Sequence, residues 1–327
     1  MSPSTAKAAV TGPILTLNNG VRMPSLGFGT FASQGSEGET HRAVVCALNA
    51  GYRHLDCAAF YQNEGEVGTG IKEFLAANPS VSRSDIFICT KVWNHLHQPE
   101  DVEYSLQQSL KLLQVDHVDA FLVHWPIASK RNKDYSPMIG ADGKYVIDDE
   151  LTQNPEPTWR AMESAYSRGL TRSIGVSNFT AADMTKVLSF AKVAPTMNQI
   201  EIHPFLPQDA LIAFCIAHKI VPVAYSPLGS QDQVPGTGEK VSTNQELNRV
   251  AEAKGASLAQ VLIAWGLKRG YVVLPKSSNP GRIESNVQLV QLTEEEFEAV
   301  NKVAKGRWTR FVNMKDTFGF DVWPEEA

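Results

Sequence analysis

The feature that most constrains the fold of this 327-residue chain is a regular alternation of short β-like runs with amphipathic helical stretches. Eight such runs occur along the chain, and eight is the number of strands that a closed parallel barrel requires. The predicted strands span residues 25–30, 54–58, 86–91, 118–125, 171–177, 196–203, 221–227 and 272–277. We therefore predict an α/β fold, a (β/α)8 TIM barrel.

The segments between these runs include four clear helical stretches, several of which open with proline in the first turn, where proline is favoured. They span residues 64–77, 99–113, 155–169 and 207–219. Ahead of the first barrel strand, Asn19-Gly20 separates two short apolar runs, which is a strong hairpin signal. We expect a flexible tail over residues 1–13 and a single barrel domain with an N-terminal β-hairpin over residues 14–327.

Two long loops and a C-terminal tail interrupt the alternation. Residues 129–157 and 228–243 each follow a predicted strand and precede a helix, which places them on the barrel face where active sites form. The tail begins at Arg307 and is rich in aromatic residues. We expect it either to help line a pocket or to act only as a hydrophobic strap across the barrel.

Composition and charge exclude several classes of function. The formal net charge of -5 argues against nucleic acid as the main partner. Apolar stretches are too short to span a bilayer, and the first residues lack the charged-then-apolar order of a secretory signal. The four cysteines are scattered and form no Cys-x-x-Cys pair, which favours reduced, buried thiols. We expect a cytoplasmic protein that binds neither nucleic acid nor membrane and is a monomer or weak dimer.

Four residues at or near the C-terminal ends of predicted strands suggest acid/base chemistry on a carbonyl group: Asp56, Tyr61, Lys91 and His124. A phenol with its ordinary pKa near 10 is a poor acid/base group at neutral pH unless a cation lowers that pKa. Lys91 is the candidate cation, and Asp56 would hold it charged and in place. A neutral His124 could donate a hydrogen bond to the substrate oxygen.

Four motifs closely resemble those of the aldo-keto reductase family. Residues 51–64, Gly-Tyr-Arg-His-Leu-Asp-Cys-Ala-Ala-Phe-Tyr-Gln-Asn-Glu, resemble its signature around the catalytic Asp and Tyr. Leu122-Val-His-Trp-Pro resembles its histidine motif, Gly175-Val-Ser-Asn-Phe its nicotinamide motif, and Leu274-Pro-Lys-Ser its phosphate motif. Within the family, the sequence is similar to fungal-type glycerol dehydrogenases, glyceraldehyde reductases and sugar or sugar-acid reductases.

The resemblance implies a reversible, NADPH-dependent reduction of a small aldehyde or ketone by hydride transfer. It makes Tyr61 the general acid in reduction, assisted by the other three residues at the strand ends. It also implies that Ser177, Asn178 and Gln199 hydrogen-bond the nicotinamide carboxamide, and that Tyr225 stacks on the nicotinamide ring. The other residues that it assigns to NADP(H) are Gly29, Thr30, Ser226, Leu228, Gly229, Lys276, Ser277, Ser278, Arg282 and Asn286.

Two of those residues also predict a phosphate site from their position alone. Lys276 and Arg282 fall where the eighth strand ends and a helix begins, and backbone N–H groups there favour an anion. A cationic pair at this place favours NADP over NAD, although solvated surface charge is the usual role of such a pair. For the substrate, the resemblance implies a small-molecule carbonyl compound in a pocket lined by Phe31, Trp93 and Trp125.

Each prediction for a single residue has a structural alternative. Asp56 and Lys91 could be only a buried ion pair that braces the barrel. Tyr225 alone is more typical of a packing aromatic, and Ser177-Asn178 of a helix cap. Because the other motif residues are also present, the functional interpretation is favoured in each case.

Two other functions remain as alternatives. His95 and His97 follow the third predicted strand and His203 ends the sixth, as the ligands of a metal-dependent barrel hydrolase do. No acidic ligand is clearly placed to complete such a site, so we expect His95 and His97 to be exposed loop residues. The second alternative is a non-catalytic relative that keeps only the nucleotide pocket, against which the complete set of four strand-end residues argues.

Overall fold

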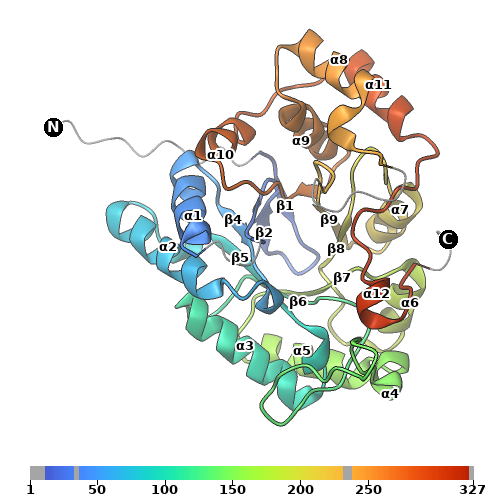
Figure 1. The fold of residues 1–327 in the computed structure, drawn as a ribbon. Coiled ribbons are helices and arrows are strands. Elements are labelled where there is room, and N and C mark those ends of the chain that lie inside the picture. The colour runs from blue at the N-terminus through green and yellow to red at the C-terminus, as the bar shows by residue number, and fades with distance from the viewer. Residues whose placement is uncertain (1–11, 33–36, 231–237, 324–327) are drawn as a thin grey trace.

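The computed structural model describes residues 12–32, 37–230 and 238–323. Eight parallel strands form one sheet in the order β10-β9-β8-β7-β6-β5-β4-β3, so that neighbours in the chain are neighbours in the sheet (Figure 1). The strands are β3 (Phe28–Gly29), β4 (His54–Asp56), β5 (Phe87–Val92), β6 (Ala120–Val123), β7 (Ile174–Ser177), β8 (Met197–Glu201), β9 (Val221–Tyr225) and β10 (Val272–Val273).

The first and last strands of this sheet meet, which closes it into a barrel. Leu26 and Val273 form a parallel bridge. The N–H of Gly27 donates to the carbonyl of Val273 at 3.0 Å, and the N–H of Val273 donates to that of Ser25 at 2.8 Å. The predicted (β/α)8 fold is confirmed, and each observed strand lies within its predicted run except β5, which extends one residue beyond it to Val92.

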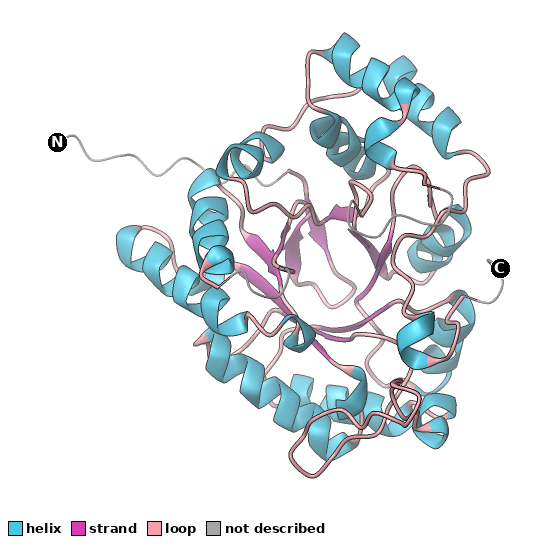
Figure 2. Cartoon of the chain, in the orientation of Figure 1, coloured by secondary structure: helices cyan, strands magenta, loops and turns pink. Residues whose placement is uncertain are grey.

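Helices surround the strands as an outer layer (Figure 2). Two of them, α2 (Glu64–Ala77) and α3 (Pro99–Leu113), have the bounds predicted from sequence. Pro99 opens α3 because the first helical position needs no N–H donor. The other helices are α1 (Glu39–Ala50), α4 (Asp149–Gln153), α5 (Glu156–Ser167), α6 (Ala181–Phe190), α7 (Asp209–Ala217), α8 (Gln245–Lys254), α9 (Leu258–Lys268), α10 (Pro280–Asn286), α11 (Glu294–Ala304) and α12 (Lys315–Phe318).

The N-terminal hairpin, β1 (Ile14–Thr16) and β2 (Arg22–Pro24), covers one end of the barrel. Its side chains Asn18 and Asn19 donate to the carbonyls of Pro195 and Arg172, which precede β8 and β7. Its buried Met23 packs with residues from inside the barrel. The hairpin therefore plugs the N-terminal end of the strands, and the C-terminal end stays available for a site.

The long loops contain more structure than the sequence suggested. Short antiparallel bridges pair Ser129 with Ile147 and Ile139 with Tyr145, and helix α4 follows them. These bridges join residues that carry no alternating apolar pattern, so strand periodicity could not reveal them. Residues 231–237 of the second loop and 1–11 of the predicted tail lie outside the described residues.

Three of the four cysteines are buried, whereas Cys46 is only partly so, and all four are free thiols. Across the described part of the chain, the structure contains no helix with the length and apolarity needed to cross a membrane.

Candidate active site

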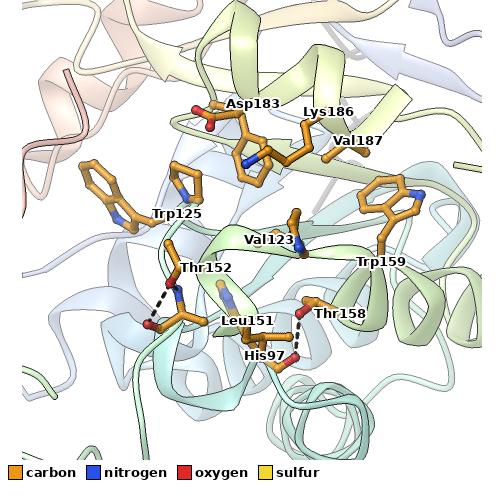
Figure 3. A pocket seen from close by; sticks show the side chains of 14 residues that line it. His97, Val123, Trp125, Leu151, Thr152, Thr158, Trp159, Asp183, Lys186 and Val187 are labelled. Carbon is orange, nitrogen blue, oxygen red and sulfur yellow. Dashed lines mark hydrogen bonds between the residues drawn. The ribbon is translucent and has the colours of Figure 1, made fainter. Parts of the chain in front are cut away.

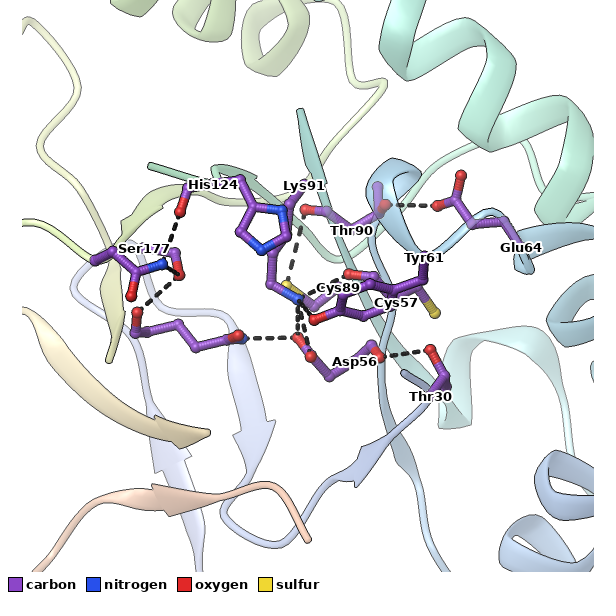
Figure 4. Close-up of polar contacts among 12 residues, drawn as sticks. Thr30, Asp56, Cys57, Tyr61, Glu64, Cys89, Thr90, Lys91, His124 and Ser177 are labelled. Carbon is purple, nitrogen blue, oxygen red and sulfur yellow. Dashed lines mark hydrogen bonds and ion pairs between the residues drawn. The ribbon is translucent and has the colours of Figure 1, made fainter. Parts of the chain in front are cut away.

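A buried ion pair joins two neighbouring barrel strands at their C-terminal ends (Figure 4). The Nζ atom of Lys91 on β5 donates to both carboxylate oxygens of Asp56 on β4, each at 2.8 Å. It also donates to the carbonyl of Cys57 at 2.9 Å and lies 3.3 Å from the hydroxyl oxygen of Tyr61. Lys91 is completely buried. The convergence predicted from sequence is therefore present for these three side chains.

Burial and charge interactions together set the protonation of Lys91 and Tyr61. Burial alone would lower the pKa of Lys91, but Asp56 and Tyr61 outweigh it and the pKa is raised, so the ammonium group stays charged. Burial raises the pKa of Tyr61 to about 12, while the charge of Lys91 acts in the opposite direction. The predicted effect of Lys91 has the expected sign, but the prediction that the phenol pKa falls below 10 is wrong for this structure. Desolvation and the nearby Asp56 carboxylate are stronger.

His124 follows β6 and lies beside the cluster. Its ring centroid is 6.0 Å from that of Tyr61 and 4.9 Å from that of Trp93. Burial, followed by the charge of Lys91, lowers the pKa of His124 well below its ordinary value. The ring is therefore neutral at pH 7 and can donate one hydrogen bond, as the sequence predicted.

The four residues predicted to contact nicotinamide form one polar network with this cluster. The hydroxyl of Ser177 donates to the carbonyl of Gln199 at 2.8 Å, and the amide of Gln199 donates to Asp56 at 2.7 Å. The amide of Asn178 donates to the backbone carbonyl of His124 at 2.9 Å. Its side-chain oxygen accepts a hydrogen bond from the hydroxyl of Tyr225 at 2.7 Å.

Backbone strain marks the same region. Asn178 has φ of 64° and Ser226 has φ of 46°, a left-handed conformation that residues other than glycine rarely adopt. Gly229, with φ of 72°, could carry no side chain, because a Cβ atom would lie 2.7 Å from Val241. Such strained positions concentrate at binding and catalytic sites, where the surrounding structure holds them. The neighbouring Leu228 is partly buried.

Five of the predicted cofactor residues line one hollow of about 190 Å³, its open mouth included. Gly29 and Thr30 form one side, and Lys276, Ser277 and Ser278 the other. A Cβ atom on Gly29 would lie 3.3 Å from Lys276, so glycine keeps this hollow open. The donors on its walls, a lysine ammonium and serine hydroxyls, are those that an anionic phosphate group requires.

Two further predicted residues lie on α10, next to this hollow. The Nε atom of Arg282 donates to the hydroxyl of Ser277 at 3.2 Å, and Asn286 is buried at the helix end. Glu39 was not predicted from the sequence, and its carboxylate is 3.7 Å from the Nζ atom of Lys276. A single acidic residue at the start of a helix carries no signal of its own, because such residues commonly favour the helix dipole.

Aromatic side chains surround Tyr61 and His124. Phe31 packs edge-on against Tyr61 at 5.3 Å and is half exposed. Trp93 is buried and stacks on Phe60 at 3.9 Å. Phe60 was missed as a separate residue, although it lies within the signature segment. The wall beside the cluster is therefore apolar, and two of the three predicted substrate residues, Phe31 and Trp93, contribute to it.

Trp125, the third predicted substrate residue, also faces a second pocket (Figure 3). This space of about 450 Å³, its open mouth included, lies among β6, α4, α5 and α6 and is lined by Trp125, Trp159, His97 and Lys186, among others. Neither Tyr61 nor Lys91 lines it. The pocket is therefore separate from the cluster at the strand ends.

The histidines of the hydrolase alternative do not come together. His97 is buried, and burial lowers its pKa to about 3, so the prediction of an exposed loop histidine is wrong for this residue. His95 is partly exposed, and His203 is hydrogen-bonded to Glu201. Over the described ranges, no group of three or more histidine, cysteine or acidic side chains is arranged to hold a metal ion. The side chains give that alternative no support.

The fold and this arrangement of side chains are those of a barrel oxidoreductase, and sequence comparison identifies the family. The sequence matches the model of the Aldo/keto reductase family over residues 25–305. This chain belongs to the aldo/keto reductase family, as its motifs predicted.

Individual relatives place it more closely within that family. The sequence is 62% identical to "Glycerol 2-dehydrogenase (NADP(+))" of Hypocrea jecorina over 311 residues, which covers 95% of this chain and 98% of the relative. It is 42% identical to "Aldo-keto reductase family 1 member A1" of Xenopus tropicalis, with 95% of this chain and 94% of the relative covered.

Solved structures agree with this placement. An aldose reductase from Schistosoma japonicum superposes with a TM-score of 0.84 at 33% identity, covering 95% of this chain and 98% of that one. A Bombyx mori aldo-keto reductase in complex with NADP superposes with a TM-score of 0.83 at 36% identity, covering 97% of this chain and 100% of that one.

Proposed function

We propose that this protein reduces small aldehydes or ketones reversibly with NADPH, and that Tyr61 is the proton donor. The observation that carries the proposal is the position of Lys91 Nζ, 2.8 Å from Asp56 and 3.3 Å from the Tyr61 hydroxyl. A buried ammonium group next to a phenol stabilises the phenolate that remains after the proton has left. A purely structural ion pair would need no phenol beside it.

The residues of the polar network fit a nicotinamide nucleotide. Ser177, Asn178 and Gln199 would hold its carboxamide, and Tyr225 would lie against its ring. When bound, the nucleotide supplies the hydride. Asn178 links these nicotinamide-binding residues to the catalytic cluster. Its amide N–H donates to the backbone carbonyl of His124, and its side-chain oxygen accepts a hydrogen bond from the hydroxyl of Tyr225. Ser226, Leu228 and Gly229 follow Tyr225 and would line the path of the pyrophosphate.

The protein's own part of the reaction is to orient the carbonyl and to move a proton. Neutral His124 would donate a hydrogen bond to the substrate oxygen and so set its direction towards Tyr61. The phenol would then give its proton to that oxygen, with Lys91 balancing the developing charge and Asp56 holding Lys91. In the oxidation direction, the phenolate would accept the proton from the alcohol.

The hollow beside β3 and α10 supports a preference for the phosphorylated cofactor. Lys276 and Arg282 supply two cationic side chains, and Ser277 and Ser278 supply hydroxyl groups, at a place where barrels commonly bind phosphate. Asn286, buried at the end of α10, would lie towards the adenine. The names of two relatives, an NADP(+) dehydrogenase and a reductase solved with NADP, agree with this preference.

For the substrate, we propose a small polyol or aldose, or sugar-acid, carbonyl compound in a pocket walled by Phe31, Trp93 and Trp125. The name of the Hypocrea jecorina relative supports glycerol as the alcohol in the oxidation direction. The test is an initial-rate comparison of glyceraldehyde, xylose, arabinose, galacturonate and an aromatic aldehyde with NADPH and with NADH. Turnover of glyceraldehyde with NADPH is expected, whereas NADPH binding without turnover of any aldehyde would favour the non-catalytic alternative.

We also propose that residues 14–327 act as one catalytic domain, because the barrel and the C-terminal tail both supply side chains around the site. The free, mostly buried thiols support a reducing compartment such as the cytoplasm. A monomer or weak dimer is expected, which sedimentation of the purified protein at several concentrations would test.

A further inference from the structure

A buried carboxylate fastens the C-terminal tail to the barrel. Glu201 is the last residue of β8 and is completely buried. One of its carboxylate oxygens accepts the backbone N–H of Phe311 at 2.8 Å, and the other accepts that of Val312 at 2.9 Å. The guanidinium group of Arg310 lies 3.8 Å away. A single side chain of the barrel wall thus binds three consecutive residues of the tail.

His203 completes this arrangement. Its Nδ1 atom accepts the backbone N–H of Phe205 at 3.2 Å, so the ring proton is on Nε2. The Nε2 atom then donates to Glu201 at 2.7 Å, and the ring of His203 packs 4.8 Å from that of Phe311. Both polar side chains are completely buried. The carboxylate therefore has a full set of donors only while the tail is in place.

From this attachment the tail continues to helix α12 (Figure 1). After α12 begins at Lys315, the backbone carbonyl of Thr317 accepts the N–H of Tyr145 at 3.1 Å. The ring of Phe318 then lies 6.1 Å from that of Trp93 and 5.9 Å from that of Trp125. The tail thus supplies part of the wall that two predicted substrate residues share.

A second contact links the end of the tail to the attachment at Glu201. The guanidinium carbon of Arg310 lies 3.9 Å from the ring centroid of Trp323, which is buried. Arg310 also approaches Glu201, so the attachment on β8 and the last described residue of the tail share one cation. Movement at Glu201 would be passed to both Phe318 and Trp323.

We propose that Glu201 is a positioning residue that sets the shape of the substrate pocket by holding the C-terminal tail against the barrel. It acts through the tail and contacts neither of the proton-transfer groups. Its partner across the sheet is Tyr225, so the attachment also adjoins the predicted nicotinamide site. This inference rests on the proposed function, because a substrate pocket is needed for its kinetic effect.

The chain offers a matched control in Glu163 on α5. This buried carboxylate also accepts two consecutive backbone N–H groups, from Lys192 at 2.6 Å and Val193 at 2.8 Å, and pairs with Arg160. Lys192 and Val193 lie between α6 and β8, at the N-terminal end of the barrel. Glu163 therefore also holds two consecutive N–H groups, through one oxygen while the other faces Arg160, and has no connection to the aromatic wall.

The test compares Glu201→Gln with Glu163→Gln, because glutamine keeps the size of the side chain in both. At Glu201 the new amide group must face an N–H group, whereas at Glu163 it can face Arg160. Hydrogen exchange of the segment 309–323 should become at least about 10-fold faster in Glu201→Gln and stay unchanged in Glu163→Gln. Any faster exchange in the control should be confined to residues 191–194. In steady-state assays, Glu201→Gln should raise the KM for glyceraldehyde about 10-fold more than it raises the KM for larger aldehydes. The affinity for NADPH should stay within about 3-fold of that of wild type.

Faster exchange of the tail without any change in KM would overturn the proposal, as would unchanged exchange of the tail. If Glu201→Gln does not fold, Val312→Pro removes one of the bound N–H groups without altering Glu201, and the same two results are expected. A wild-type protein without carbonyl turnover would overturn the proposed function and the kinetic half of this inference together. Exchange of the tail would still show whether Glu201 holds it, so the two failures are distinguishable.

Discussion

Two buried aspartates, one at each end of the barrel, show how the same kind of ion pair serves different purposes. At the N-terminal end, Asp119 accepts hydrogen bonds from Arg83 and Arg172, each at 3.0 Å, and from the backbone of Ile88. At the C-terminal end, Asp56 binds Lys91. The side chains of Arg83 and Arg172 are 21% and 47% exposed, whereas that of Lys91 is 0% exposed.

This difference in burial shows which of the two ion pairs can take part in catalysis. Arg83 and Arg172 each donate one N–H group to a different oxygen of Asp119, and a guanidinium group with an exposed end stays charged, so the pair serves as a brace. The compact ammonium group of Lys91 lies 3.3 Å from the Tyr61 hydroxyl as well as next to Asp56, and burial makes its field strong at that point. A phenol lies beside only the second of these two aspartate sites. We therefore expect substitutions at the two ends to separate stability from activity.

The largest effect is expected from Tyr61→Phe, which removes the proton donor and keeps the ring. Turnover of glyceraldehyde should fall about 10²- to 10⁴-fold, the usual contribution of a general acid. NADPH affinity should be nearly unchanged, because the hydroxyl group is not among the predicted cofactor contacts. Initial rates and a fluorescence titration of NADPH check both statements, and retained turnover would contradict the role of Tyr61.

The next effect compares Asp56→Asn with Asp119→Asn directly. Asp56→Asn should lower turnover about 100-fold, because Lys91 loses the group that holds it next to Tyr61. Asp119→Asn should lower the free energy of unfolding by roughly 2–3 kcal/mol and leave the turnover of folded enzyme within about 3-fold of wild type. Denaturant unfolding and initial rates give the four values. Equal loss of turnover in the two variants would remove the distinction between brace and catalytic pair.

A smaller effect is expected at the phosphate hollow. Arg282→Ala should weaken NADPH binding about 10- to 100-fold, the value of a lost charge-assisted hydrogen bond, and should weaken NADH binding far less. Titrations of the two nucleotides with the variant provide the measurement. Equal weakening of both would place Arg282 outside the phosphate site.

The smallest effect comes from Glu39→Gln. The Glu39 carboxylate is 3.7 Å from Lys276, and both side chains are partly exposed, so the pair is weak and competes with a bound phosphate for the lysine. Its removal should tighten NADPH binding by about 2- to 5-fold, in line with the strength of exposed ion pairs. Weaker NADPH binding in this variant would show that Glu39 supports the hollow instead of opposing it.

These comparisons also show what local sequence can predict. Strand periodicity and helix-start signals predicted all eight barrel strands and the bounds of α2 and α3, because apolar spacing and a proline at the first turn are local properties. The strand-end position of Asp56 and Lys91 predicted their meeting, because neighbouring parallel strands end at the same edge.

What the sequence did not reveal depends on contacts between distant segments. The carboxylate of Glu201 binds the tail across 110 residues of chain, and Glu39 at the start of α1 reaches Lys276 in the loop after β10. The burial of His97 was also missed, because a histidine in a polar loop carries no local sign that other elements cover it. The inward position of Glu201, two residues after Gln199 on β8, was the one available signal for its role.

The pH dependence of alcohol oxidation in wild type and Lys91→Met tests the central claim most directly. Oxidation needs the phenolate of Tyr61, and burial raises its pKa to about 12 in this structure. The wild-type rate should therefore rise steadily with pH above neutrality. Because Lys91 favours the phenolate, Lys91→Met should lower the phenolate fraction, and with it the oxidation rate, about 10- to 1000-fold at every pH from about 7 to 10, while the rise with pH keeps the same slope. An oxidation rate in Lys91→Met close to that of wild type across this range would contradict the account.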